Sequence, residues 1–270
     1  MMVSDMTVGI AIYGVAPGQS SLALSLGLSL FDTLGLKVSS ATTPRLLVGG
    51  DHPGDHEVVD VTLAELQDQI ELGNVAAFAI FNEDGAHLPW RAAFHHSIDG
   101  FGSFPHLSIQ VPEDKIGPPE AWGDGLSTIF QGLKFKYAIG YRAESASSAW
   151  NYCLGNGTTK VDERENNVKF AREIPQTRGG LGRYAGSMLR MVYPLNVLNN
   201  EHCKIMVDGV PLEELIRSSS DMGKLTDLSN GLKLWILRDS QLSNANAKLG
   251  GSGCLISWQE SNLRTTRRLP

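Results

Sequence analysis

Glycine and proline divide this chain into short segments, and that division limits the possible folds more than any other feature. The sequence holds 29 glycines and 12 prolines among 270 residues. Both interrupt regular structure, because glycine adds backbone freedom and proline removes an N–H donor. We therefore expect many turns and numerous short strands. An apolar content of 42% is ordinary for a soluble globular protein with a full core.

Several apolar runs have the length of β-strands. Thr7–Tyr13 (TVGIAIY) is bounded by Gly14, and Val75–Phe81 (VAAFAIF) has the continuous apolar character of a central strand. Further strands are expected over residues 45–48, 91–98, 106–111, 136–141, 232–237 and 254–258.

Helices are expected where apolar residues recur at helical spacing. Thr62 followed by Glu65 has the spacing of a capping box, which predicts a helix from Leu63 to about Leu72. Other helices are predicted over residues 20–36, 120–132, 144–154 and 187–193. The polar stretch 155–182 fits either a pair of edge strands or an exposed excursion.

These elements predict an α+β fold, with a mixed, largely antiparallel sheet and helices packed on it. Residues 1–270 have no linker that demands two domains, so we expect one compact unit, and a strand–helix succession at 7–36 and 135–154 leaves two similar lobes open. The break at 112–120 is a candidate sub-boundary. The basic segment 262–270 is expected to be a frayed tail.

Negative charge is concentrated near the amino-terminal end. Between Arg45 and Arg91 the chain has nine carboxylates and no lysine or arginine. The first 90 residues carry a formal charge of −9 and the remaining 180 carry +3, which gives the net −6. A field of one sign can steer an oppositely charged macromolecule, and it repels the phosphates of nucleic acid. A solvated acidic surface that keeps the protein soluble is the alternative.

We predict that a partner protein binds this acidic segment. An aromatic side chain beside a charged rim is typical of interface hot spots, and Trp90 stands at the border of the segment. Partial burial of Trp90 at the start of a strand is the alternative. The predicted partner-binding residues are Asp51, Asp55, Glu57, Asp60, Glu83, Asp84 and Trp90.

The sequence offers weak candidates for catalysis or metal binding. The Asp51–Glu57 loop has two imidazoles and three carboxylates, which suit a divalent metal, but it also has the composition of an exposed turn. His95 and His96 are neighbours in a predicted strand, so they should point to opposite faces and not chelate one ion together. The three cysteines are far apart and indicate neither a zinc site nor disulfides. We therefore expect no catalytic residue, metal or cofactor.

The uncharged stretch 6–31 is long enough in principle to cross a bilayer. It contains four serines and four glycines, and no lysine or arginine stands near it before Lys37. A secretory signal or a membrane helix would normally have basic flanking residues. We therefore expect a cytoplasmic protein.

The second half of the chain resembles a known family. The resemblance is carried by Met188–Leu198 and His202, by Val207–Ile216 with its Asp-Gly turn, and by the segment from Gly223 through Gly231 to Trp235. Trp122–Gly123 and residues 136–141 are compatible with it. These residues are similar to the immunity protein 52 family of bacterial polymorphic-toxin systems.

The resemblance implies a non-enzymatic protein that binds and neutralises a cognate toxin. Such proteins are encoded beside toxins with a restriction-endonuclease-like nuclease domain, which a contact-dependent machine such as type VI secretion delivers. The charge pattern agrees, because a nuclease needs a positive surface that an acidic inhibitor can cover. The expected partner is thus a basic nuclease toxin, with no direct contact to nucleic acid or membrane. An enzyme that uses the Asp51–Glu57 loop with His95 or His96, and a secretion-system adaptor, are the alternatives.

Overall fold

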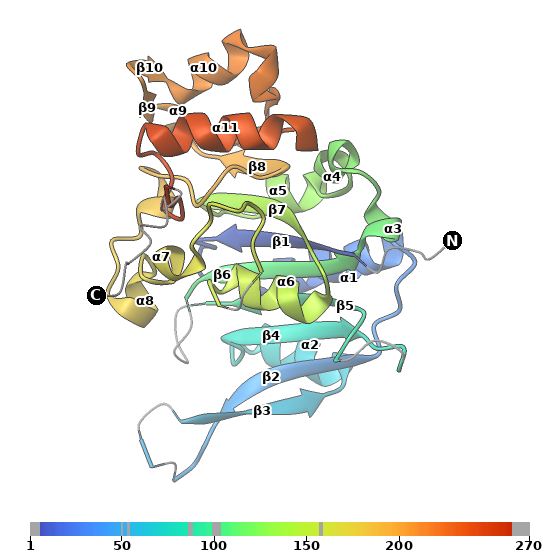
Figure 1. Ribbon diagram of the computed structural model, residues 1–270. Helices are drawn as coiled ribbons and strands as arrows, with labels where there is room; N and C mark the ends of the chain where they lie inside the picture. Colours follow the sequence, from blue (N-terminus) through green and yellow to red (C-terminus); the bar gives the residue numbers. More distant parts are fainter. Residues whose placement is uncertain are drawn as a thin grey trace, which may run out of the picture.

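Ten strands form one antiparallel sheet in the order β11-β12-β8-β7-β1-β6-β5-β4-β2-β3 (Figure 1). The structure is a computed structural model that describes residues 6–49, 51–52, 55–85, 89–98, 104–156 and 159–260. The strands are β1 (Thr7–Tyr13), β2 (Ser40–Leu46), β3 (His56–Val61), β4 (Ala77–Asn82), β5 (Ala92–Ser97), β6 (His106–Pro112), β7 (Tyr137–Ala143), β8 (Leu195–Leu198), β11 (Lys224–Asp227) and β12 (Lys233–Ile236). A separate pair joins β9 (Met206–Val207) to β10 (Val210–Pro211).

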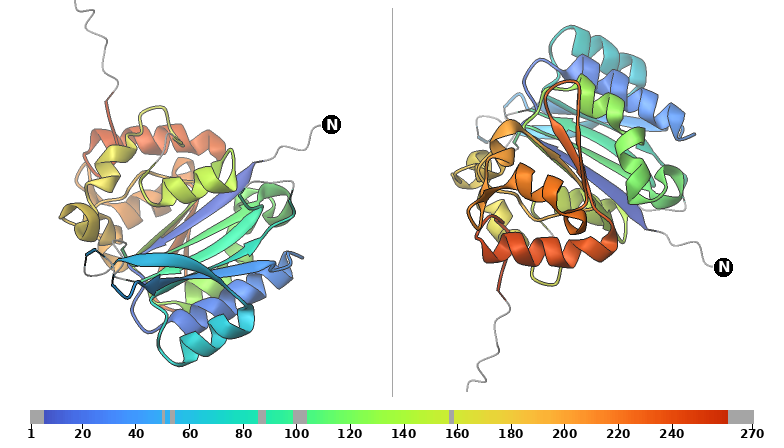
Figure 2. Two further views of the ribbon diagram at one scale, coloured as in Figure 1. Left: turned by 90° about the horizontal axis from the view of Figure 1, so that it is seen from below. Right: turned by 90° about the horizontal axis from the view of Figure 1, so that it is seen from above.

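Helices cover both faces of this sheet, which confirms the predicted α+β fold. They are α1 (Ser20–Thr33), α2 (Leu63–Glu71), α3 (Glu113–Ile116), α4 (Pro119–Gly125), α5 (Ser127–Gly132), α6 (Ala146–Cys153), α7 (Asn167–Ala171), α8 (Pro175–Arg178), α9 (Asn200–Cys203), α10 (Leu212–Ser218) and α11 (Asp239–Gly251). The views from below and above show the sheet between its two helical layers (Figure 2).

Alternate residues of β1 belong to two different cores. Ile10 and Ile12 pack into the back core, which α1, α2, α4 and α5 cover. Ala11 and Tyr13 pack into the front core, which α6, α7 and α11 complete. This alternation follows from the two-residue period of a strand. In front of β4, β2 and β3, the described chain places no helix, so this part of the sheet is open (Figure 1).

Local sequence signals predict several elements well. Thr62 and Glu65 form the expected capping box, and α2 begins at Leu63. The single helix predicted over 120–132 is two short helices, because the chain leaves helical geometry at Leu126. The polar stretch 155–182 is an excursion that carries the short helices α7 and α8 and contains no described strand.

The helix predicted over 187–193 is wrong. Leu189 bridges Leu255, and the N–H groups of Ile256 and Ser257 donate to the carbonyls of Leu189 and Arg190 at 2.8 and 3.0 Å. Every residue from 189 to 198 is buried. A segment that is buried on all sides has no polar face, so its apolar spacing does not distinguish helix from strand. The strand expected over 254–258 supplies only isolated bridges.

A fully buried arginine organises the front core. The guanidinium of Arg190 lies 3.9 Å from the ring centroid of Tyr152 and 4.1 Å from that of Phe170. Its Nη1 donates to the hydroxyl of Tyr13 at 2.8 Å, and its Nη2 donates to Oδ1 of Asn167 at 3.0 Å. These contacts tie β1, α6 and α7 to the extended segment before β8.

Arg190 also has a buried carboxylate beside it, since Glu165 Oε1 lies 3.8 Å from Arg190 Nε. We predict that Arg190→Met destabilises the protein by about 3–5 kcal/mol, because Glu165 is then buried without its cation. The double variant Arg190→Met with Glu165→Gln should lose less stability than the single variant, because no buried carboxylate is left without a cation. Urea unfolding followed by tryptophan fluorescence measures both. A single-variant loss below about 1 kcal/mol would contradict this role of the pair.

Candidate functional site

The β2–β3 hairpin leaves the main sheet at Pro44. Residues 40–42 of β2 pair with residues 79–81 of β4, and residue 44 is the next one whose backbone N–H would point toward β4. Proline has no N–H to donate. The Oγ1 of Thr43 donates instead to the carbonyl of Ala77 at 2.9 Å. Beyond this point β2 pairs only with β3, so the hairpin projects from the sheet (Figure 1).

The projecting hairpin exposes apolar side chains. Leu46 is 58% exposed and Val58 is 67% exposed, and Leu47 and Val48 also face solvent. Single exposed apolar residues are normal on protein surfaces, but several on one hairpin mark an interaction surface. None of these exposed residues was among those predicted from the sequence to bind a partner. A proline within a strand was the available signal, because it marks an edge.

A concave surface lies between this hairpin and α6, which we call the front trough. It encloses about 450 Å³ and is lined mainly by apolar and aromatic side chains, among them Pro44, Val58, Phe81, Trp90, His95 and Trp150. Ring centroids of Trp90 lie 5.1 Å from Phe81 and 5.6 Å from His95. His95 stacks on Trp150 of α6 at 4.0 Å. The aromatic residue predicted to anchor a partner is therefore part of the wall of the trough.

Four of the predicted acidic residues lie on the hairpin. Asp51 and Asp55 belong to the loop between its strands, and Asp55 accepts a hydrogen bond from the His52 N–H at 2.9 Å. Glu57 shares the back face with Arg45 and pairs with it at 2.6 Å. Asp60 is three residues further along β3, so its side chain points to the front.

The other two predicted carboxylates lie elsewhere. Glu83 and Asp84 follow β4, and the N–H of Glu83 donates to Ser39 Oγ at 2.8 Å. Ser39 precedes β2, whereas Asp51 lies beyond its far end, about 20 Å away along the strand at ~3.3 Å per residue. Asp84 lies 3.9 Å from Arg91. The seven predicted residues thus surround the hairpin and the trough without forming one continuous patch.

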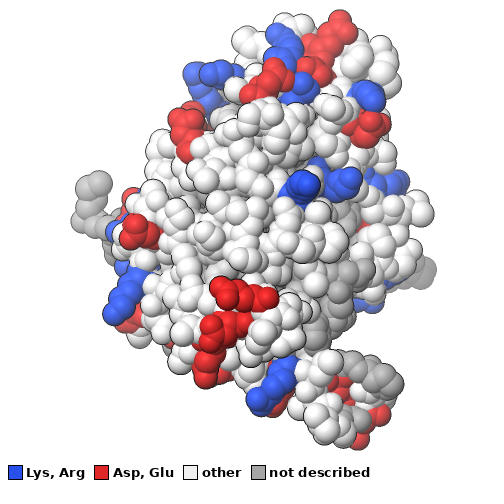
Figure 3. All heavy atoms as spheres, turned by 180° about the vertical axis from the view of Figure 1, so that it is seen from behind, with Lys and Arg blue, Asp and Glu red and all other residues white. Residues whose placement is uncertain are grey.

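Further carboxylates gather behind the hairpin, over α2 (Figure 3). Glu65, Asp68 and Glu71 of this helix are exposed. They extend the acidic character of the hairpin region to the back of the molecule, although they were not among the predicted partner-binding residues.

The prediction that His95 and His96 face opposite sides of the sheet is confirmed. His95 lines the front trough, whereas the ring of His96 stacks on Phe78 of the back core at 5.2 Å. Burial lowers the pKa of His95 to about 3, with a further contribution from His106. Burial likewise lowers the pKa values of His96 and His106 to about 4. These imidazoles are therefore uncharged at neutral pH.

Within the residues that the structure describes, no three His, Cys, Asp or Glu side chains are grouped so that they could hold a metal ion. In the same part of the chain, no helix combines the length and apolar character needed to cross a membrane.

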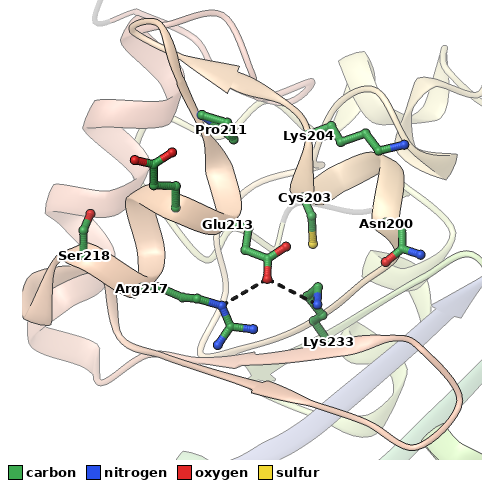
Figure 4. A pocket seen from close by; sticks show the side chains of 9 residues that line it. Asn200, Cys203, Lys204, Pro211, Glu213, Arg217, Ser218 and Lys233 are labelled. Atoms are coloured by element: carbon green, nitrogen blue, oxygen red, sulfur yellow. Dashed lines mark hydrogen bonds and ion pairs between the residues drawn. The ribbon is translucent and has the colours of Figure 1, made fainter.

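A second cavity of about 720 Å³ lies between α9, α10 and β12 (Figure 4). The carboxylate of Glu213 lies between Arg217 Nε at 3.0 Å and Lys233 Nζ at 3.3 Å. Asp227 pairs with the same two cations at 2.9 and 2.6 Å. Burial raises the pKa of the adjoining Cys203 thiol to about 11. Because two carboxylates compensate the two cations and the thiol is protonated, this cluster offers neither an uncompensated charge nor a nucleophile.

Comparison with known proteins gives a shared fold. No protein-family model matches the sequence, and no curated protein matches it. The chain is similar in structure to the Pseudomonas aeruginosa T6SS protein PA0821, with a TM-score of 0.53 and 12% sequence identity, over 93% of this chain and 73% of that one. At this identity, the likeness shows the fold alone. Membership of the immunity protein 52 family stays a prediction.

A weaker likeness is to a chain from a crystal structure of the toxic C-terminal tip of CdiA from Pseudomonas aeruginosa in complex with immune protein. The TM-score is 0.29 and the identity 13%, over 53% of this chain and 88% of that one. A likeness of this size carries no argument.

The buried histidines predict a loss of stability in acid. Burial also lowers the pKa of His202 to about 4, so four imidazoles stay neutral in the folded state while the unfolded chain protonates near pH 6.5. The unfolded state binds more protons in this window, so stability is full above about pH 6.5 and falls as the pH drops toward 4. Urea unfolding at pH 7.5, 6 and 5 measures the slope.

His96 offers a variant for this measurement, because both of its ring nitrogens are buried without a hydrogen-bond partner. His96→Phe should keep the stack on Phe78 and change stability at pH 7.5 by no more than about 1 kcal/mol. The loss of unfolding free energy between pH 7 and pH 5 should also be smaller in this variant by about 2 kcal/mol, since one titrating group is removed. An unchanged slope in this variant would show that His96 does not contribute.

Proposed function

We propose that this protein is an immunity protein that binds a basic nuclease toxin and inhibits it without catalysis. The observation that carries the proposal is the β2–β3 hairpin, which projects from the sheet with exposed apolar residues and acidic side chains around them. The hairpin and the front trough together form the toxin-binding surface. The toxin is the cognate toxin of an immunity protein of the immunity protein 52 family.

The composition of this surface supports protein binding. Stable interfaces combine an apolar centre with a polar or charged rim, and aromatic residues are frequent among their hot spots. Here Val58 lines the trough together with Trp90 and Trp150, and the exposed Leu46 and the carboxylates of Asp51 and Asp60 lie on the same hairpin. An isolated hairpin gains little stability from exposed apolar side chains, so their presence is explained best by a partner that covers them.

The charge of the region supports a basic partner. A nuclease domain attracts phosphates through lysine and arginine, and an acidic inhibitor complements that surface. Arg45 is the only lysine or arginine from residue 38 to residue 90, and Glu57 neutralises it. The fold that the chain shares with a T6SS protein supports a place in a secretion-linked toxin system.

The direct test uses the toxin domain encoded by the adjacent open reading frame. Purified protein should bind this domain in a 1:1 complex and stop its cleavage of plasmid DNA at equimolar concentration. Metal analysis of the purified protein separates the proposal from a metal-dependent enzyme. Unimpaired cleavage in a tenfold excess of the protein, or a stoichiometric bound metal ion, would contradict it.

Charge reversal tests the binding surface. Asp51→Lys with Asp60→Lys should raise the dissociation constant for the toxin domain at least about tenfold in 50 mM salt, with a smaller effect in 500 mM salt. The matched control is Asp68→Lys with Glu71→Lys on α2, which changes the net charge equally but not the hairpin. Calorimetric titration measures both. If the two double variants weaken binding equally, the effect comes from net charge alone or the toxin does not bind at the hairpin, and the proposed binding surface is wrong.

A further inference from the structure

We propose that the outer edge of β3 receives an extended, basic segment of the partner as an additional antiparallel or parallel strand. The inference rests on the proposed function, because the partner is the toxin. It adds the mode of binding, in which backbone hydrogen bonds supply affinity and alternate side chains supply specificity.

The edge of β3 is open within the described chain. The sheet ends at β3, and β2 is the only described strand that pairs with it. Neither lysine nor proline occurs in its six residues, and these are two of the usual devices that prevent pairing at an edge. Of its two carboxylates, Glu57 is paired with Arg45, so the uncompensated negative charge on the strand is that of Asp60. That charge repels an acidic strand but attracts a basic one.

The register shows which backbone groups of β3 face outward. The N–H of Leu47 donates to the carbonyl of Asp55 at 2.9 Å, one step beyond the Leu46–His56 pair. Hydrogen-bonded and non-hydrogen-bonded pairs alternate along an antiparallel ladder. The backbone groups of Glu57 and Val59 therefore face β2, whereas those of Val58 and Asp60 face away from it.

The side chains of Val58 and Asp60 lie on the same face of β3, so side chains of an added strand could contact both of them. Both lie on the front, where Val58 lines the trough and is 67% exposed. A residue of the added strand opposite Val58 would cover it and extend the apolar surface of the trough. A lysine or arginine opposite Asp60 would form a cross-strand pair, which contributes at this spacing.

Charge selects this occupant over a second copy of the chain. Pairing of two β3 edges would bring together two hairpins that each carry Asp51, Asp55, Glu57 and Asp60 against one Arg45. A basic nuclease domain has the opposite charge and is steered toward the hairpin. The oligomeric state of the free protein, measured by light scattering, should accordingly be the same for the unmodified protein and for a variant substituted in β3.

A proline at residue 58 tests the hydrogen bonds directly. Val58→Pro removes an outward N–H and leaves the ladder to β2 intact, because proline is tolerated at an edge when its missing N–H faces solvent. It should raise the dissociation constant for the toxin domain at least about tenfold. Val58→Ala is the matched control, since it shortens the side chain but keeps the N–H, so Val58→Pro should raise the constant at least about tenfold more than Val58→Ala does. Equal losses in both variants would overturn the inference.

Amide hydrogen exchange on the unmodified protein gives a second readout that does not depend on the fold of a variant. In the free protein, the amides of Val58 and Asp60 should exchange quickly and those of Glu57 and Val59 slowly. In the toxin complex, all four should be protected. If the toxin domain binds and Val58 and Asp60 still exchange as in the free protein, the added strand is wrong and the proposed function stands. If the toxin domain does not bind, both are wrong.

Discussion

The regular sheet ends and the projecting hairpin begins at Pro44, which has no N–H to donate and lies opposite Ala77, the first residue of β4. Each interior strand of a sheet satisfies backbone groups on both of its edges, and β2 does so only through residue 42. At residue 44 the donor toward β4 is absent, and the hydroxyl of Thr43 takes over its acceptor on Ala77. From there the chain continues as a two-stranded hairpin whose outer edges remain available. The candidate binding surface thus begins where β2 lacks a donor and where β4 itself starts.

The rest of the molecule has a different character, because its buried arginine has a carboxylate beside it and its buried histidines are uncharged. Arg190 is enclosed by aromatic rings, hydroxyl and amide acceptors and the carboxylate of Glu165, which makes the front core specific rather than merely apolar. The buried histidines are kept uncharged by the same interior. Even the charged cavity at α10 pairs its cations with carboxylates. Among these regions the hairpin stands out, since its apolar side chains lack a described covering element.

Sequence reasoning succeeded where a local signal has one physical meaning. The capping box at Thr62 fixed the start of α2, and the alternation of a strand placed His95 and His96 on opposite faces. It failed over residues 187–193, whose apolar spacing suits a helix, because residues 189–193 are buried without helical structure and are held by a bridge to Leu255.

The sequence also did not show which of the predicted residues lie close together in the fold. Glu83 follows Asp60 by 23 residues, and only the register of β2 with β4 shows that Glu83 lies near the start of β2, remote from the hairpin loop. The exposure of Leu46 and Val58 was also hidden, since a strand of this composition is normally half buried. Nothing in the sequence alone indicated that Glu165, in a polar stretch, would be buried beside Arg190.

The structure of the complex with the toxin domain would show where the toxin binds. We predict that the toxin covers Leu46, Leu47, Val48 and Val58, lies against the open edge of β3 and presents lysine or arginine side chains to Asp51 and Asp60. A toxin seated instead at the other end of the sheet, on β11 and α10, with the hairpin still exposed to solvent, would contradict it.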